Sequence, residues 1–300
     1  MPGEISAYRV DATVRGKGFE AGGFSGIESR FVSDFSLFTK EILPDKSAEM
    51  RVSFDNAQLA GSFMDVPFEM GYSPERAYFF YGNTSMDTAN GTLPSGNQQF
   101  AFFSTPISVQ VAPNGTVQKI DGPEGMASLL SAVPRLSFVE YPGETMQPGK
   151  QWESNFALPV PGFGAPVQAR IVNTFYGYQV MSGRQCGVVQ QTYTTEGKMP
   201  GADATNTEGG ITLALPSFDL NGQGLVYFDI TDGRLVHTAL NLQLTMGLSQ
   251  SLGGLSNLLS TLTQDINELS GDGAESQQNL LDLMLTIEGA ITLVEPAAPR

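Results

Sequence analysis

The chain has 300 residues and carries 31 acidic against 16 basic side chains, a formal net charge of −15. Such a surface repels phosphate backbones and anionic lipid headgroups, which argues against nucleic acid and against electrostatic docking to membranes. Only 16% of the residues are charged, whereas glycine (34) and proline (18) are frequent. This composition is typical of a turn-rich β protein, and the length is sufficient for a sizeable core.

Apolar and polar residues alternate in three early segments, which predicts antiparallel strands. From Tyr8 to Val14 the even-numbered residues are apolar and the odd-numbered ones are polar. Phe31, Phe35 and Leu37 share one face of a second strand, and a third strand follows around Met50. The polar stretch from residue 83 to 99 predicts a long exposed loop.

A hairpin and a helix complete the first part of the chain. Two β segments flank Asn114-Gly115 between residues 100 and 121, where an Asn-Gly pair indicates a tight turn. Residues 123–134 begin with a proline, end at a proline and carry apolar residues at helical spacing, so a short helix is expected there.

Residues 141–164 are rich in proline and glycine and contain the only tryptophan, Trp152. We interpret this stretch as a connection between an N-terminal β half (1–140) and a C-terminal β half (165–300). The tryptophan is either a packing anchor or a surface on which a ligand stacks, and the first is favoured.

The second half contains the most distinct pattern, a hairpin from residue 222 to 248. Strands are first expected at 167–180 and 186–195, and two alternating arms then flank Asp232-Gly233. That dipeptide predicts a type I′ turn, which requires positive φ at both central residues. On the second arm the even-numbered residues from Val236 onward form a dry face, and Leu235 is assigned to the wetter face with His237.

An insertion at 249–279 precedes a last alternating strand. Leucines and isoleucines at three- and four-residue spacing predict an amphipathic helix over 253–270. This helix is interpreted either as a fixed part of the core or as a lid over the sheet. The fold class is therefore mainly β: one large curved antiparallel sheet, or two β-sheet halves, with two short covering helices.

The residues that carry most enzyme and metal chemistry are scarce. His237 is the only histidine, and in mid-strand it is interpreted as structural. Cys186 is the only cysteine, which excludes an internal disulfide and predicts a buried strand thiol. No nucleophile elbow, nucleotide-binding glycine motif or calcium-loop spacing occurs. We therefore expect no enzyme, no cofactor and no metal site. The sequence also lacks an apolar run long enough for a membrane span or a secretory signal.

The remaining signal is a surplus of apolar surface, which two helices and one sheet must cover. Either the sheet surfaces form a dry core, or they enclose a cavity for a hydrophobic ligand. The candidate ligand-binding residues lie on the hairpin, the insertion and the last strand: Leu240, Leu242, Leu244, Met246, Leu255, Leu259, Leu262, Ile266, Leu283 and Leu285.

The segments VQVAPNGTVQKIDG, PGKQWESNFALP and FDITDGRL, in that order, resemble those of uncharacterised bacterial exported β-proteins. More distantly, the order of elements resembles the Lol-type lipoprotein-carrier fold. That resemblance implies a curved antiparallel half-barrel closed by helices over a hydrophobic cavity, in a periplasmic or cell-surface protein. The expected partners are a lipid, an acyl chain or a protein. The chain differs from a typical carrier in its greater length, its lack of a lipobox cysteine and its 249–279 insertion. The alternative is a structural or protein-interaction module with a dry core, and an enzyme ranks third.

Overall fold

The computed structural model describes residues 2–18, 26–63, 65–91, 103–122, 139–158, 167–195, 206–208, 211–213, 217–248 and 281–294. Both predicted helices, 123–134 and 253–270, lie outside these residues. A short 3₁₀ helix, η2 (Thr88–Asn90), lies within them. No helix within the described ranges is long and apolar enough to cross a membrane.

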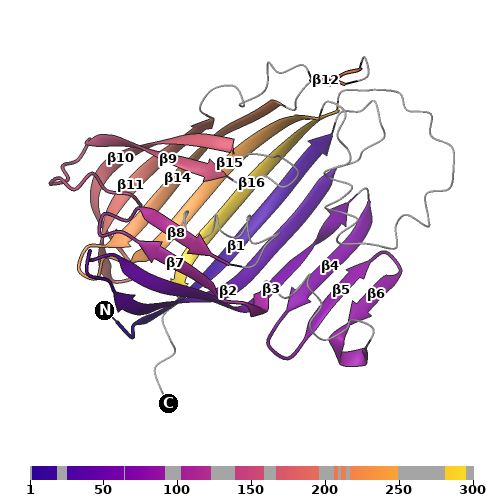
Figure 1. The fold of residues 1–300 in the computed structure, drawn as a ribbon, viewed down its shortest axis with the longest axis horizontal. Coiled ribbons are helices and arrows are strands. Elements are labelled where there is room, and N and C mark those ends of the chain that lie inside the picture. Colours follow the sequence, from indigo (N-terminus) through magenta and orange to yellow (C-terminus); the bar gives the residue numbers. More distant parts are fainter. Residues whose placement is uncertain are drawn as a thin grey trace.

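The protein is mainly β and is built on one large antiparallel sheet of fourteen strands (Figure 1). A separate two-stranded sheet is formed by β12 (Asn206–Glu208) and β13 (Ile211–Leu213). In the large sheet β7 (Ile107–Val111) branches from β3 and carries β8 (Val117–Asp121). The other strands follow one path: β6 (Thr84–Asp87), β5 (Ala77–Tyr81), β4 (Val66–Tyr72), β3 (Ala48–Phe63), β2 (Ile27–Ile42), β1 (Ile5–Gly18), β16 (Leu281–Val294), β15 (Leu235–Leu248), β14 (Ser217–Asp229), β11 (Arg184–Thr195), β10 (Val167–Met181) and β9 (Gln151–Leu158).

The first and last strands meet in the middle of the sheet. β1 pairs with β2 on one side and with β16 on the other, so a single ladder joins the strands on either side of residue 140. Of the two predicted arrangements, the structure has the first, one large sheet that contains strands from both halves of the chain. The stretch predicted as a connection, 141–164, contains β9, which pairs with β10.

The two faces of the sheet follow the predicted alternation. Tyr8, Phe35 and Val226 are buried on the face that we call the inner face. Arg9 and Asp34, each next to one of these residues in sequence, lie on the opposite, outer face and pair with each other. The period of two along β1 and β2 therefore places the ion-paired side chains on the face opposite the aromatic core.

Part of the inner face is covered by the hairpin of β7 and β8, which lies over the central strands in Figure 1. Ile107 and Val109 of β7 are completely buried, in one cluster with Tyr8, Phe35 and Val226. The Asn114-Gly115 hairpin is thus confirmed, but the predicted two-residue turn is wrong, because residues 112–116 connect the strands and Asn114 does not have positive φ. Its turn places Gly115 at φ 87°, where a Cβ would lie only 2.0 Å from the carbonyl oxygen of Val139.

A β-bulge at Asp55 explains how one strand serves two neighbours. Asp34 pairs with Asn56 and Phe35 with Phe54, which leaves Asp55 as the extra residue of β3. The first part of β3 pairs with β7 and the last part with β4. Such a bulge bends the strand and increases its twist, which allows β7 to leave the plane of β4.

The hairpin between β14 and β15 is confirmed, but its predicted turn type is wrong. Gly233 has φ 68°, whereas Asp232 does not have positive φ, so the turn is not type I′. Residues 230–233 form a longer loop, closed by a hydrogen bond from the Asp229 amide to the Arg234 carbonyl at 2.8 Å. Positive φ at both central residues occurs instead at Ser182-Gly183, in the two-residue turn between β10 and β11.

Two further predictions are corrected by the strand register. Tyr227 pairs with His237 and Phe228 with Leu235, so Val236 is an extra residue at a bulge. Leu235 is consequently buried with the core, not on the wetter face. The predicted loop at 83–99 begins instead with strand β6 and the 3₁₀ helix.

Candidate functional site

The predicted ligand-binding residues that fall in described strands lie on β15 and β16. Leu240 and Leu242 are half-buried, and Leu244 is buried. The ladder pairs Leu244 with Leu285 and Met246 with Leu283, so the backbone brings the two predicted groups together. The four predicted residues of the insertion lie outside the described ranges: Leu255, Leu259, Leu262 and Ile266.

Glycines lie next to these leucines on the neighbouring strands. Gly222 and Gly224 of β14 pair with Leu242 and Leu240, and Gly289 of β16 also pairs with Leu240. A Cβ at Gly222 would lie 2.5 Å from Leu242 Cδ2, so the leucine side chain occupies the space above the glycine. The Gly-x-Gly spacing in β14 is the sequence signal for this contact, because glycine within a strand marks a close approach.

A chain of buried polar side chains crosses β9, β10 and β11. The Tyr193 hydroxyl donates to Gln191 Oε1 at 2.7 Å, and Gln191 Nε2 donates to Asn173 Oδ1 at 2.9 Å. Asn173 Nδ2 then donates to Ser154 Oγ at 3.0 Å. Burial raises the pKa of Tyr193, so its hydroxyl stays a donor across the physiological range. The sequence does not reveal these contacts, because the members come from three strands whose register it does not give.

At the end of the sheet that carries the tight turns, an ion pair joins the β10–β11 and β14–β15 loops. Arg184 Nη1 lies 2.8 Å from the carboxylate of Asp229, whose side chain is 5% exposed. Burial acts to raise the pKa of Asp229, but the Arg184 guanidinium and the amides of Thr231 and Asp232 outweigh it and lower the pKa. This ion pair is best explained as structural, because Arg184 and Asp229 neutralise each other's charge.

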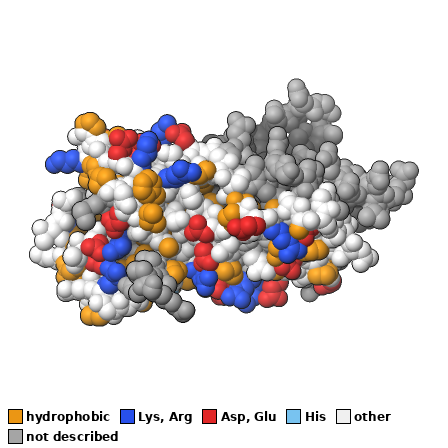
Figure 2. Space-filling view, turned by 90° about the horizontal axis from the view of Figure 1, so that it is seen from below, with side chains coloured by type: hydrophobic (Ala, Val, Ile, Leu, Met, Phe, Trp, Pro, Cys, Tyr) orange, Lys and Arg blue, Asp and Glu red, His pale blue; other side chains and the backbone are white. Residues whose placement is uncertain are grey.

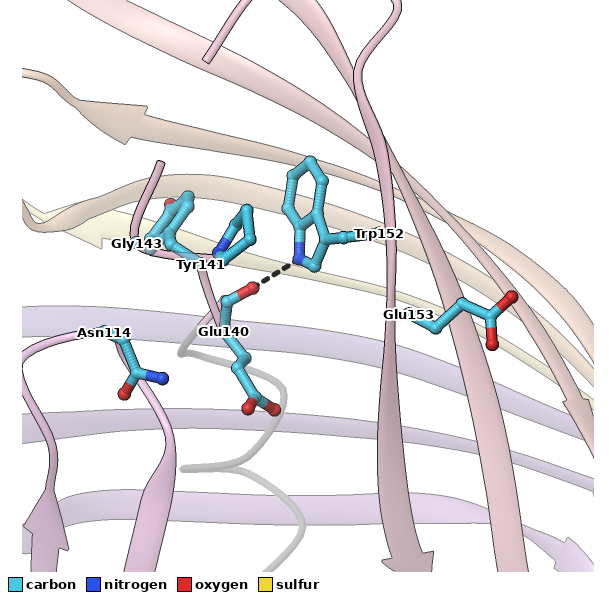
Figure 3. A pocket seen from close by; sticks show the side chains of 7 residues that line it. Asn114, Glu140, Tyr141, Gly143, Trp152 and Glu153 are labelled. Carbon is cyan, nitrogen blue, oxygen red and sulfur yellow. Dashed lines mark hydrogen bonds between the residues drawn. The ribbon is translucent and has the colours of Figure 1, made fainter. Parts of the chain in front are cut away.

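A pocket of about 240 Å³ lies where residues 140–143 pass the start of β9 (Figure 3). The Trp152 indole reaches across and donates to the carbonyl oxygen of Glu140. Tyr141 packs near Trp152 with ring centroids 6.3 Å apart and contacts Phe228 at 5.0 Å. The described residues that line it are Asn114, Glu140, Tyr141, Pro142, Gly143, Trp152 and Glu153.

The two residues most suited to catalysis occupy structural positions. His237 Nδ1 lies 2.9 Å from Thr292 Oγ1, and burial lowers the pKa of the imidazole. Cys186 is fully buried, as predicted, and burial raises the pKa of its thiol. Within the described residues, no group of three or more His, Cys, Asp or Glu side chains is arranged to hold a metal ion.

Comparisons with known proteins provide no family for this chain. No family model matches it, and no curated protein matches its sequence. Among solved structures it is similar to OccK7 (OpdD) of Pseudomonas aeruginosa at 6% identity and a TM-score of 0.20, over 97% of this chain and 98% of the other. A similarity at that level carries no argument about fold or function.

Proposed function

We propose that the protein is a non-enzymatic binder or carrier of a hydrophobic ligand, a lipid or an acyl chain, and that it acts outside the cytoplasm. The observation that carries the proposal is the half-buried leucine surface on the inner face of β15. The resemblance to Lol-type carriers is its second support.

The outer face gives the sheet a fully solvated side. Arg9 pairs with Asp34 at 2.7 Å, Arg30 with Asp11 at 2.5 Å, and Arg15 with Glu288 at 3.3 Å. Figure 2 presents one side of the molecule, on which acidic and basic side chains lie next to each other. These ion pairs occupy the outer face, so the apolar inner face is the side of the sheet that suits an apolar ligand.

The inner face is filled unevenly. Around β7 it is a packed core, in which Val109 and Phe35 are completely buried. Around β15 and β16, in contrast, Leu240, Leu242 and Ile287 keep part of their surface exposed. An acyl chain laid along these residues would remove that apolar surface from water, at a gain of about 25 cal/mol per Å².

The alternative, a structural or protein-interaction module with a dry core, is favoured by the densely packed region around β7. The two functions differ in what they require at Leu242. A ligand site requires that this surface be reached by a small apolar molecule, whereas a dry core requires that it not be reached.

Binding of N-phenyl-1-naphthylamine, a neutral dye that fluoresces in apolar surroundings, tests the proposal on delipidated protein. Leu242→Glu should weaken dye binding at least about tenfold, because it places a charge on the apolar surface. Gln243→Glu is the matched control, since Gln243 is exposed on the same strand. Native mass spectrometry of the untreated protein should detect a co-purified lipid.

Leu240→Phe keeps the surface apolar and fills space, so it should reduce dye binding without lowering the melting temperature. This variant covers the case in which Leu242→Glu prevents folding. Equal dye binding by wild type, Leu240→Phe and Gln243→Glu would contradict the proposal, and complete absence of dye binding would favour the dry-core module.

A further inference from the structure

The two ends of the main strand path differ in how they finish. β6 has four residues and is followed at once by the 3₁₀ helix at 88–90, so it presents little free backbone. β9 has eight residues, keeps an unbroken register with β10 from Gln151 to Leu158, and contains no proline. No other strand pairs with β9 among the residues that the structure describes. Proteins usually protect such an edge with a bulge, a proline or a very short strand.

The hydrogen-bonding side of each β9 residue follows from one observed bond. The Phe175 amide donates to the carbonyl of Lys150 at 2.9 Å, directly before β9 begins. Because the backbone groups of an antiparallel strand alternate between its two sides, Trp152 and Ser154 bond to β10. The amides and carbonyls of Gln151, Glu153 and Asn155 therefore point to the open edge, and the side chains of these three residues are exposed.

The pocket borders this edge, since Glu153 belongs to its lining. Its wall is held in place by the bond from Trp152 to the Glu140 carbonyl and by the packing of Tyr141. In Figure 3 the Glu140 carboxylate and the Asn114 amide lie on the same side of the Trp152 ring. A side chain of an incoming strand could enter this space while its backbone pairs with β9.

Charge indicates which side chain fits. Lys150 is engaged by Glu144 at 2.6 Å, and the Glu153 carboxylate is engaged by Arg170. Glu140 pairs with no basic group in the described part of the chain, so among the described residues of the pocket it is a carboxylate without a basic partner. A lysine or arginine suits such a site, because its alkyl stem packs on rings while its charged end meets a carboxylate.

We propose that the edge of β9 binds an extended basic segment of a partner protein, which adds a strand to the sheet and inserts a lysine or arginine beside Glu140. Main-chain bonds to Gln151, Glu153 and Asn155 supply affinity, and the pocket supplies the preference for a basic side chain. A second copy of this chain is a poorer occupant, since each copy carries a net charge of −15.

The chain contains its own reporter, because Trp152 is the only tryptophan. The probe is a short fluorescein-labelled peptide alternating lysine with valine, and its counterpart has glutamate in place of lysine. We expect the basic peptide to gain anisotropy, to change the Trp152 emission and to protect the amides of Glu153 and Asn155 from hydrogen exchange. The acidic peptide should do none of these.

Asn155→Pro removes one outward amide without touching the bonds to β10, because proline is tolerated at the exposed side of an edge strand. It should abolish peptide binding at an unchanged melting temperature. Glu140→Gln should weaken binding about two- to fivefold, as expected for a partly exposed ion pair. Glu75→Gln, an exposed carboxylate on the β4–β5 turn, is the charge-matched control and should bind as wild type does.

Equal binding of the two peptides, or full binding by a folded Asn155→Pro variant, would overturn the proposal. So would concentration-dependent dimerisation that Asn155→Pro abolishes, since the occupant would then be a second copy. If Asn155→Pro does not fold, wild-type protein decides the question. A Glu153 amide that the basic peptide fails to protect from hydrogen exchange would show that the peptide does not bind at the β9 edge. The dye experiment on Leu242 is independent of all these results.

Discussion

Asp34 and Phe35 are neighbours on β2, yet they belong to two different environments. On the solvated outer face, the Asp34 carboxylate accepts hydrogen bonds from Arg9 of β1 and from Asn56 of β3. Phe35 is 1% exposed and packs against Tyr8 at a ring distance of 5.3 Å. One step along the chain thus separates a contact that water could replace from one that water cannot.

The difference indicates that the two faces have different roles. The inner face supplies stability, and the outer face influences which strands pair with each other. Exposed ion pairs contribute little each, because solvent screens them and long side chains lose freedom when they pair. Burial of a large aromatic side chain contributes several kcal/mol. We therefore expect substitutions on the inner face to affect folding, and substitutions on the outer face to affect solubility and strand register.

The largest effect should come from the inner face. Phe35→Ala removes a ring from the centre of the main core cluster, and large-to-small changes of this kind cost roughly 3–5 kcal/mol. Urea unfolding followed by tryptophan emission measures the change. A loss below about 1 kcal/mol would mean that the core collapses onto the vacant space, or that the two faces differ less than proposed.

An intermediate effect is expected where a charged pair is withdrawn from solvent. Asp229→Asn breaks the bond to Arg184 but keeps an acceptor for the loop amides, so it should cost about 1.5–3 kcal/mol. Thermal unfolding at neutral pH measures it. Asp121→Asn, an exposed carboxylate, is the control and should leave the melting temperature unchanged.

The same carboxylate should make stability depend on pH. The folded-state pKa of Asp229 is lowered, so its stabilisation is complete above the unfolded pKa of about 4 and is lost as pH falls through the lower folded value. The difference in stability between wild type and Asp229→Asn should therefore be constant from pH 7 to about 5 and shrink below pH 4. A difference that grows on acidification would show that the sign is wrong.

A substitution in the β14–β15 loop tests backbone strain without changing a side chain on either face of the sheet. Gly233 has φ 68°, and a Cβ there would meet nothing within 4 Å. Gly233→Val should therefore cost about 1–2 kcal/mol through backbone strain alone. Gly233→Asn should cost less, because asparagine tolerates positive φ. Equal melting of the two variants would refute backbone strain as the cause.

The smallest effect should be found on the outer face. Arg9→Gln removes a hydrogen-bonded ion pair whose arginine is 57% exposed. Its urea midpoint should stay close to that of wild type, and the small change should vanish in high salt. A loss comparable to that of Phe35→Ala would end the distinction between the faces.

The local pattern was sufficient to predict most of this architecture. Alternation along residues 8–14 and 28–37 identified the strands and assigned their faces, because the period of two is a property of each strand by itself. The hairpins at Gly115 and Gly233 were likewise local. What could not be predicted depends on partners remote in sequence, such as the pairing of β1 with β16 and the branching of β7 from β3.

A bulge explains the error on Leu235, and a second one at Asp55 could not be located from the sequence. A single extra residue reverses the assignment of every side chain beyond it, and nothing in the surrounding letters marks its position. The polar chain from Ser154 to Tyr193 is hidden for a related reason. Its members come from three strands, and only the register of β9, β10 and β11 brings them together.

The central ladder also sets the order in which the molecule can assemble. Arg15 and Glu288 meet across β1 and β16 although they are 273 positions apart in the chain. During synthesis on the ribosome, β1 and β2 are complete long before β16 emerges, and β1 spends that interval with one row of amides and carbonyls unpaired. Such an edge recruits other nascent chains, so the yield of folded protein should depend on translation speed and on chaperones that shield β1 until its partner arrives.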